Sequence, residues 1–113
     1  MQRIAFAAPL LPGKTETDLE VMASFSSGER RPDYEASRRR AGVERESVWL
    51  QRTPEGDFAV VLIEADDVGA AMGTIATSQE PFDVWFREHI AEVHGMDLAA
   101  GFPPPEQVLD FQA

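Results

Sequence analysis

The segment Phe58–Ala65 (FAVVLIEA) is apolar at nearly every position, and this constrains the fold more than any other feature of the chain. In an extended strand, successive side chains point to opposite faces of the sheet. The even positions from Phe58 to Leu62 therefore share one face, and the odd positions from Ala59 to Ile63 share the other. A sheet with one face in water alternates apolar with polar residues. We therefore expect both faces of this strand to be covered.

Three further segments read as strands, and turn signals separate them. Thr53-Pro54-Glu55-Gly56-Asp57 indicates a hairpin, because proline presets the first central turn position and glycine accepts a left-handed backbone. The segment before it is rich in Val, Trp and Leu, as strands are. The predicted strands are Arg3–Ala8, Ser47–Thr53, Phe58–Ala65 and Glu106–Phe111, the last at a sheet edge.

Two helical regions alternate with these strands. The first begins near Thr15, is interrupted by Ser26-Ser27-Gly28 and Pro32, and resumes over 33–41 with Gly42 after its end. The second follows the capping pair Asp66-Asp67, breaks or kinks near Pro81, and continues to Val93. The pattern predicts one α+β domain over residues 1–113, with a partly irregular tail at 99–113. Its fold would be ferredoxin-like, β-α-β-β-α-β, with a four-stranded antiparallel sheet.

Two helical regions in so short a chain can cover only one face of that sheet. Burying an exposed apolar side chain contributes roughly 1.5–3 kcal/mol. Four or five such side chains left in water would forfeit an amount comparable to the whole stability of a small domain, roughly 5–15 kcal/mol. A second identical sheet is the simplest cover, which predicts a homodimer. The alternative is that the tail and an Arg-rich loop fold back as a lid.

Charge and composition narrow the classes of function. The formal net charge of −10 repels phosphate backbones and anionic lipids, so we expect neither a nucleic-acid nor a membrane partner. The chain has no cysteine and no apolar run long enough to span a bilayer, which favours a cytoplasmic protein. Six of the ten basic residues lie between Arg30 and Arg45. They indicate a solvated helix end or, alternatively, an anion-binding lip.

The stretches Glu46–Asp57 (ESVWLQRTPEGD), Pro81–His89 (PFDVWFREH) and His94–Leu98 (HGMDL) carry a resemblance to a known group. They are similar to an uncharacterised bacterial subfamily of the ferredoxin-like, dimeric α/β-barrel superfamily. The resemblance implies a homodimer in which two sheets close face to face into a barrel. Members of that superfamily include cofactor-free monooxygenases, haem-degrading enzymes, sugar mutarotases and proteins with no known activity, so no single reaction is implied.

His89 is the candidate catalytic residue. Trp85 lies one helical turn before it, and a histidine at the border of an aromatic face can act as a general base or orient a ligand. The alternative is a half-exposed histidine hydrogen-bonded to a backbone carbonyl or to a carboxylate, for example that of Glu92. Trp49 is expected to line either a ligand pocket or a dimer core. Trp85 and Tyr34 complete the candidate ligand-binding set.

Metal and cofactor sites are not expected. His89 and His94 are five residues apart, so they lack the i, i+4 spacing that lets two imidazoles on one helix share an ion. Pro12-Gly13-Lys14-Thr15 follows a strand and opens a helix, but Ala8 stands where a phosphate-binding loop needs its first glycine.

These observations support a homodimer with a small, mainly apolar pocket and metal-free proton-transfer or oxygenase-type chemistry on a small organic ligand. The alternative is a non-catalytic ligand-binding or assembly module. A third hypothesis is haem binding, for which a histidine-dependent Soret band would be the sign.

Overall fold

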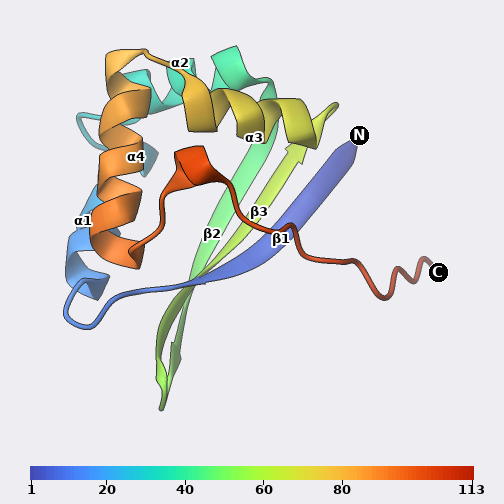
Figure 1. The fold of residues 1–113 in the computed structure, drawn as a ribbon, viewed down its shortest axis with the longest axis horizontal. Coiled ribbons are helices and arrows are strands. Elements are labelled where there is room, and N and C mark those ends of the chain that lie inside the picture. The colour runs from blue at the N-terminus through green and yellow to red at the C-terminus, as the bar shows by residue number, and fades with distance from the viewer.

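The computed structural model describes residues 1–113 and consists of one antiparallel sheet with helices packed on it (Figure 1). The central strand β3 pairs with β1 on one side and with β2 on the other. The elements in chain order are β1 (Gln2–Pro9), α1 (Thr15–Ser26), α2 (Arg31–Ala41), β2 (Val43–Thr53), β3 (Gly56–Ala65), α3 (Val68–Thr77), α4 (Pro81–His94) and the 3₁₀ turn η1 (Leu98–Ala100).

The predicted four-stranded, ferredoxin-like sheet is wrong. The sheet has three strands and is open, and the element order is β-α-α-β-β-α-α. Glu106–Phe111 forms no strand, although its composition resembles one. Three consecutive prolines, at 103–105, cannot donate to a sheet ladder and carry the chain past the free edge of β1. Figure 1 shows this tail running out beyond β1 to the C-terminus.

The predicted breaks within both helical regions are confirmed, and each one separates two helices. A proline lies in the first turn of α2 and of α4, where its missing N–H costs no helical hydrogen bond. Gly42 ends α2 in the left-handed conformation, at φ 79°. Asp67 caps α3 by accepting a hydrogen bond from the Ala70 N–H at 3.0 Å. None of the helices is both long and apolar enough to cross a membrane.

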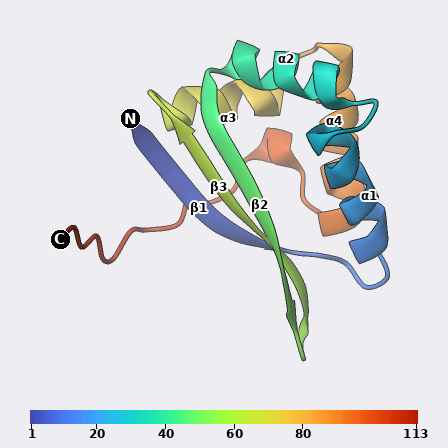
Figure 2. The same cartoon turned by 180° about the vertical axis from the view of Figure 1, so that it is seen from behind.

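The hairpin β2–β3 forms where it was expected, and its register defines the two faces of the sheet. Ala59, Ile63 and Ala65 point toward the helices and are buried. Figures 1 and 2 show the helices gathered on one side of the strands. The helices therefore cover one face and leave the other open.

The open face is a continuous apolar strip across all three strands. Its members are Phe58, Val60 and Leu62 of β3, Ala5 and Ala7 of β1, and Trp49 of β2. Trp49 is 54 % exposed. The prediction that β3 is apolar on both faces is thus confirmed, and this chain alone covers only one of them.

The helices pack on one another around Phe25 of α1. Val21, Phe25, Ile75 and Phe86 form the buried cluster. Tyr34 stacks on Phe25 with ring centroids 4.7 Å apart, and Phe82 meets the same ring edge-on at 5.6 Å. This aromatic contact joins α1, α2 and α4, so the helical layer has a core of its own beside the sheet.

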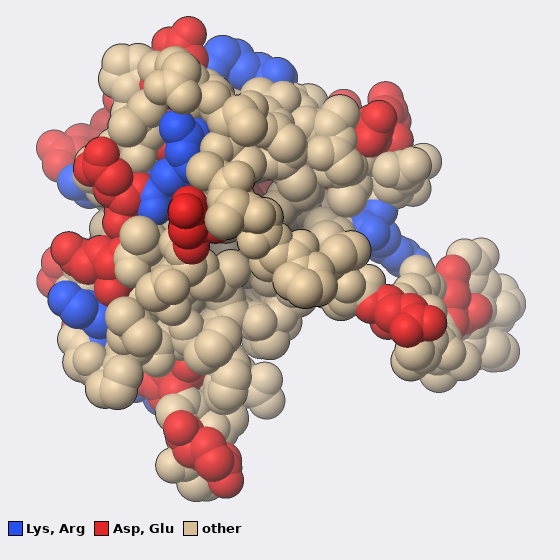
Figure 3. Space-filling model, in the orientation of Figure 1, with Lys and Arg blue, Asp and Glu red and all other residues tan.

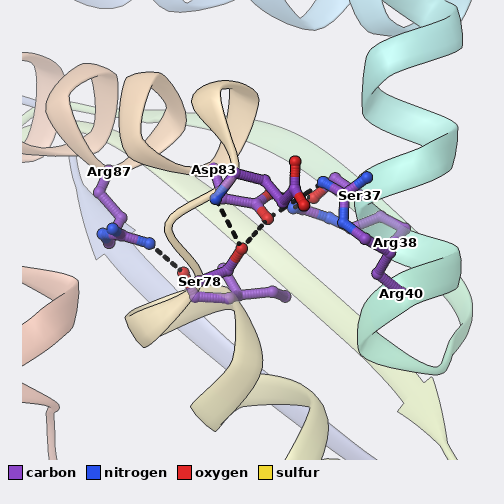
Figure 4. A network of polar contacts seen from close by, with 8 residues as sticks. Ser37, Arg38, Arg40, Ser78, Asp83 and Arg87 are labelled. Carbon is purple, nitrogen blue, oxygen red and sulfur yellow. Dashed lines mark hydrogen bonds and ion pairs between the residues drawn. The ribbon is translucent and has the colours of Figure 1, made fainter.

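A polar network ties the helices together at Asp83 of α4, which is 2 % exposed (Figure 4). Its carboxylate accepts hydrogen bonds from Ser37 and Ser78 and forms an ion pair with Arg40 at 3.2 Å. Burial alone would raise the pKa of Asp83. The hydrogen bonds from Ser37, Ser78 and Arg40 outweigh burial and hold that pKa below its usual value.

We predict that Asp83→Asn lowers the free energy of unfolding at pH 7 by roughly 2–4 kcal/mol, because the buried Ser37 and the partly exposed Ser78 and Arg40 lose a charged acceptor. The folded-state pKa of Asp83 is depressed, so its contribution is full above the ordinary value of 3.8 and is lost as the pH falls toward the folded-state value. Urea unfolding of both proteins at pH 7 and pH 3 should show the difference shrinking at pH 3. An equal difference at both pH values would contradict the prediction.

Candidate functional site

A cavity of about 340 Å³ lies between the covered face of the sheet and the helical layer. Of its 23 lining residues, 18 are hydrophobic, and they come from all three strands and all four helices. Val48 and Trp49 of the edge strand β2 belong to the lining and are 39 % and 54 % exposed. The cavity therefore opens beside β2. Its volume and apolar character are those of small-molecule sites.

The loop between β1 and α1 holds the helices at a fixed position over the sheet. The Leu10 N–H donates to the Asp57 carbonyl at 2.9 Å, and the Leu11 N–H donates to the Val93 carbonyl at 2.8 Å. At the first residue of α1, the Thr15 hydroxyl donates to Asp57 Oδ2 at 2.7 Å. One short loop is thus joined to both β3 and α4, and it fixes where α1 starts.

Asp18 of α1 and His89 of α4 form a buried pair. His89 Nε2 donates to Asp18 Oδ1 at 2.8 Å, and the two residues are 6 % and 4 % exposed. The imidazole stacks on Trp85, with centroids 5.7 Å apart and planes 13° apart. Stacking on the Trp85 indole fixes the plane of the His89 imidazole. The imidazole in turn fixes Oδ1 of the Asp18 carboxylate through its hydrogen bond.

The second oxygen of Asp18 makes no hydrogen bond within the protein, and Asp18 is one of the cavity-lining residues. No fully buried side-chain nitrogen or oxygen lacks a partner, so Oδ2 reaches accessible space. The wall therefore contains a carboxylate with one fixed oxygen and one free oxygen.

A second polar group lies in the cavity wall, where α2 meets β2. Glu46 Oε1 accepts from the Tyr34 hydroxyl at 2.5 Å and from Arg38 Nε at 2.8 Å. The Arg38 guanidinium lies between two rings, with Cζ 4.4 Å from the centroid of Phe86 and 5.0 Å from that of Tyr34. Arg38 is 5 % exposed, and its Nη1 donates to Ser37 Oγ at 3.0 Å.

Tyr34 in this group acts as a fixed donor. Its burial raises the pKa of the phenol well above the usual value, and the neighbouring Glu46 carboxylate raises it further. The hydroxyl stays protonated at physiological pH and is committed to Glu46. Tyr34 therefore orients Glu46 and does not serve as a base.

The structure separates the residues that the sequence singled out. Tyr34 and Trp49 line the cavity, whereas Trp85 and His89 do not and lie behind it in the helical layer. His89 is buried, not half-exposed as in the alternative reading, and its carboxylate partner is Asp18, whereas that reading offered Glu92 as an example. His89 can therefore act on a ligand only through Asp18.

Sequence reasoning missed Asp18, Arg38 and Glu46. Asp18 shares a helical spacing with Val21 and Phe25, and all three are buried, so a carboxylate on an apolar helix face was the available signal. Arg38 belongs to the arginine run that we read as a solvated helix end. That reading holds for Arg39, whose side chain is 82 % exposed, but not for Arg38.

His94 also lines the cavity, and its Nδ1 donates to the Pro9 carbonyl at 2.8 Å. It lies apart from the His89–Asp18 pair. No three His, Cys, Asp or Glu side chains come together where they could hold a metal ion. The titratable groups of the cavity wall are therefore Asp18, His94, Tyr34, Arg38 and Glu46.

Comparison with known proteins yields no match: no family model, no curated protein and no solved structure matches the chain. The resemblance to the α/β-barrel superfamily therefore stays a prediction. Any assignment of function depends on the geometry of the cavity.

We predict that His89→Ala lowers the free energy of unfolding by roughly 2–4 kcal/mol, because Asp18 loses its buried partner and Trp85 loses its stacked ring. Glu92→Ala, at an exposed position of the same helix, is the matched control and should change it by less than about 0.5 kcal/mol. Urea unfolding at pH 7 measures both. Equal, small effects would show that the His89–Asp18 pair does not hold α1 and α4 together.

Proposed function

We propose that the protein binds a small, mainly apolar organic molecule in the cavity beside β2 and that Asp18 accepts a proton from it. The observation that carries the proposal is the free oxygen of Asp18 in a mainly apolar wall. A buried carboxylate with a fixed orientation is a suitable general base, because it is held within reach of the ligand and shielded from water.

His89 has a positioning role in this reaction. A proton leaves the ligand and is taken by Asp18 Oδ2. Throughout this step His89 keeps its own proton, and its N–H donates to Asp18 Oδ1, which keeps the carboxylate plane fixed. The negative charge moves from the carboxylate to the ligand in the same step. The lone pair of Asp18 and the N–H of His89 are the only protein groups that this transfer requires.

Ligand binding can be tested with a fluorescent apolar probe, N-phenyl-1-naphthylamine. Val48→Phe places a ring at the mouth of the cavity and should weaken probe binding about tenfold or more. Gln51→Phe is the matched control, because it lies on the same strand but on the open face. Unchanged binding by Val48→Phe, or equal losses in both variants, would overturn the proposal. Native mass spectrometry of the purified protein would identify any molecule that stays bound.

The open face of the sheet supports a second proposal, in which the protein assembles as a homodimer through this face. Although the chain carries a net charge of −10, the face carries Arg3 and Arg45 against Glu64, so two copies can meet there without repulsion between acidic groups. Figure 3, from the side that shows η1, has acidic side chains over the helical layer, at the hairpin tip and on the tail.

The C-terminal tail adds to this surface. Val108, Leu109 and Phe111 are 87 %, 81 % and 81 % exposed, and the tail borders a hollow that Arg3, Ala5 and Leu62 also line. The strip of three strands and three residue rows measures on the order of 300 Å². A stable interface buries about 800 Å² on each partner. The exposed tail is the neighbouring apolar surface that can supply the difference.

We predict that the full chain sediments as a dimer at micromolar concentration and that Ala7→Glu converts it to a folded monomer, because a charge is then buried at the centre of the interface. Ala91→Glu introduces the same charge at an exposed position of α4 and should leave the dimer intact. Sedimentation velocity measures the mass of each. A wild-type chain that sediments as a monomer would exclude this assembly.

A further inference from the structure

The Arg38–Glu46 group in the cavity wall has one donor and one acceptor that the protein leaves unused. Arg38 donates through Nε and Nη1, and no hydrogen bond uses its Nη2. Glu46 accepts two hydrogen bonds on Oε1 and none on Oε2. Both residues line the cavity, and no fully buried nitrogen or oxygen lacks a partner, so these two atoms reach accessible space.

The ion pair makes this end of the cavity neutral overall. Arg38 and Glu46 are joined at 2.8 Å, and their side chains are only 6 % and 11 % exposed. An anionic ligand group next to Arg38 would lie beside the carboxylate of Glu46, and a cationic group would lie beside the guanidinium. In an apolar cavity such a repulsion is poorly screened. A neutral group that accepts on one atom and donates from the next avoids both repulsions.

The donor and acceptor atoms are also held in place. The guanidinium is stacked between Phe86 and Tyr34, and Ser37 anchors Nη1 from the Asp83 network (Figure 4). The Tyr34 hydroxyl, which stays protonated, holds Glu46 Oε1. Groups that are fixed before binding lose little entropy when a ligand arrives, so they can select for the ligand's hydrogen-bonding pattern.

We infer that the ligand of this cavity is a neutral molecule with an apolar body and a carbonyl group next to an N–H or O–H, of the carboxamide, lactam or hydroxycarbonyl class. The carbonyl accepts from Arg38 Nη2, and the adjoining N–H or O–H donates to Glu46 Oε2. The inference rests on the proposed ligand-binding function, because it assigns a ligand class to the same cavity. Asp18 then faces another part of the same molecule.

Three probes of nearly equal shape test the class: 2-naphthamide, which is neutral, 2-naphthoate, which is an anion, and 2-naphthamidinium, which is a cation. We expect the wild-type protein to bind 2-naphthamide at least tenfold more tightly than either ion, as measured by calorimetry at pH 7. Stronger binding of either ion, or equal binding of all three, would overturn the ligand class and leave the cavity as a binding site. Failure of all three probes and of N-phenyl-1-naphthylamine would instead overturn the proposed function itself.

A variant of Glu46 provides the second test. Glu46→Gln leaves the charge of Arg38 uncompensated, so the affinity for 2-naphthoate relative to 2-naphthamide should rise about tenfold or more. Glu35→Gln is the matched control, because Glu35 pairs with Arg31 and Arg39 on the surface, and it should leave the ratio unchanged. An unchanged ratio in Glu46→Gln would show that this ion pair does not select the ligand.

Discussion

The structure depends on the central strand β3, which is apolar on both faces and pairs with strands on both edges. A strand of this kind must remove both faces from water, and the helices reach only one of them. The helical layer has its own aromatic core around Phe25 and packs on the buried side chains Ala59, Ile63 and Ala65 of β3 without filling the whole space between the two layers. The covered face is therefore only partly filled, which leaves the cavity, and the other face is left open. Both proposals arise from this one constraint.

Buried charges are the second constraint, and the protein satisfies them within itself. Asp18, Arg38 and Asp83 are all nearly inaccessible, and each is paired with a side chain from another element. A buried ion without a partner would cost several kcal/mol, so these pairs also specify which helix packs where. Three polar atoms of these groups have no hydrogen-bond partner in the protein: Asp18 Oδ2, Arg38 Nη2 and Glu46 Oε2. In the proposed function, these remaining atoms are the polar groups that a ligand in the cavity would meet.

Much of the fold could be predicted from local patterns, because hairpins, proline breaks and helix ends have short-range causes. The hairpin at Pro54–Gly56, the breaks before α2 and α4, and the two apolar faces of β3 all follow from neighbouring residues. The predicted fourth strand failed because strand composition does not reveal whether an edge is reachable after three prolines. Asp18, Arg38 and Glu46 come together from three elements, and no spacing in the sequence predicts such a meeting. His89 was singled out as the candidate catalytic residue, but its partner Asp18 lies 71 residues away in the sequence, where no local pattern points to it.

Trp49 links the cavity to the open face. It pairs with Val60 on the open side of the sheet, and it also belongs to the cavity lining at the free edge of β2. A second copy packed on the open face would bury part of this exposed indole and reduce its freedom to move at the mouth of the cavity. Trp49 would then belong both to the dimer interface and to the mouth of the cavity. In the two proposals, the same apolar pattern of β3 that favours a second copy would thus also shape the entrance of the ligand site.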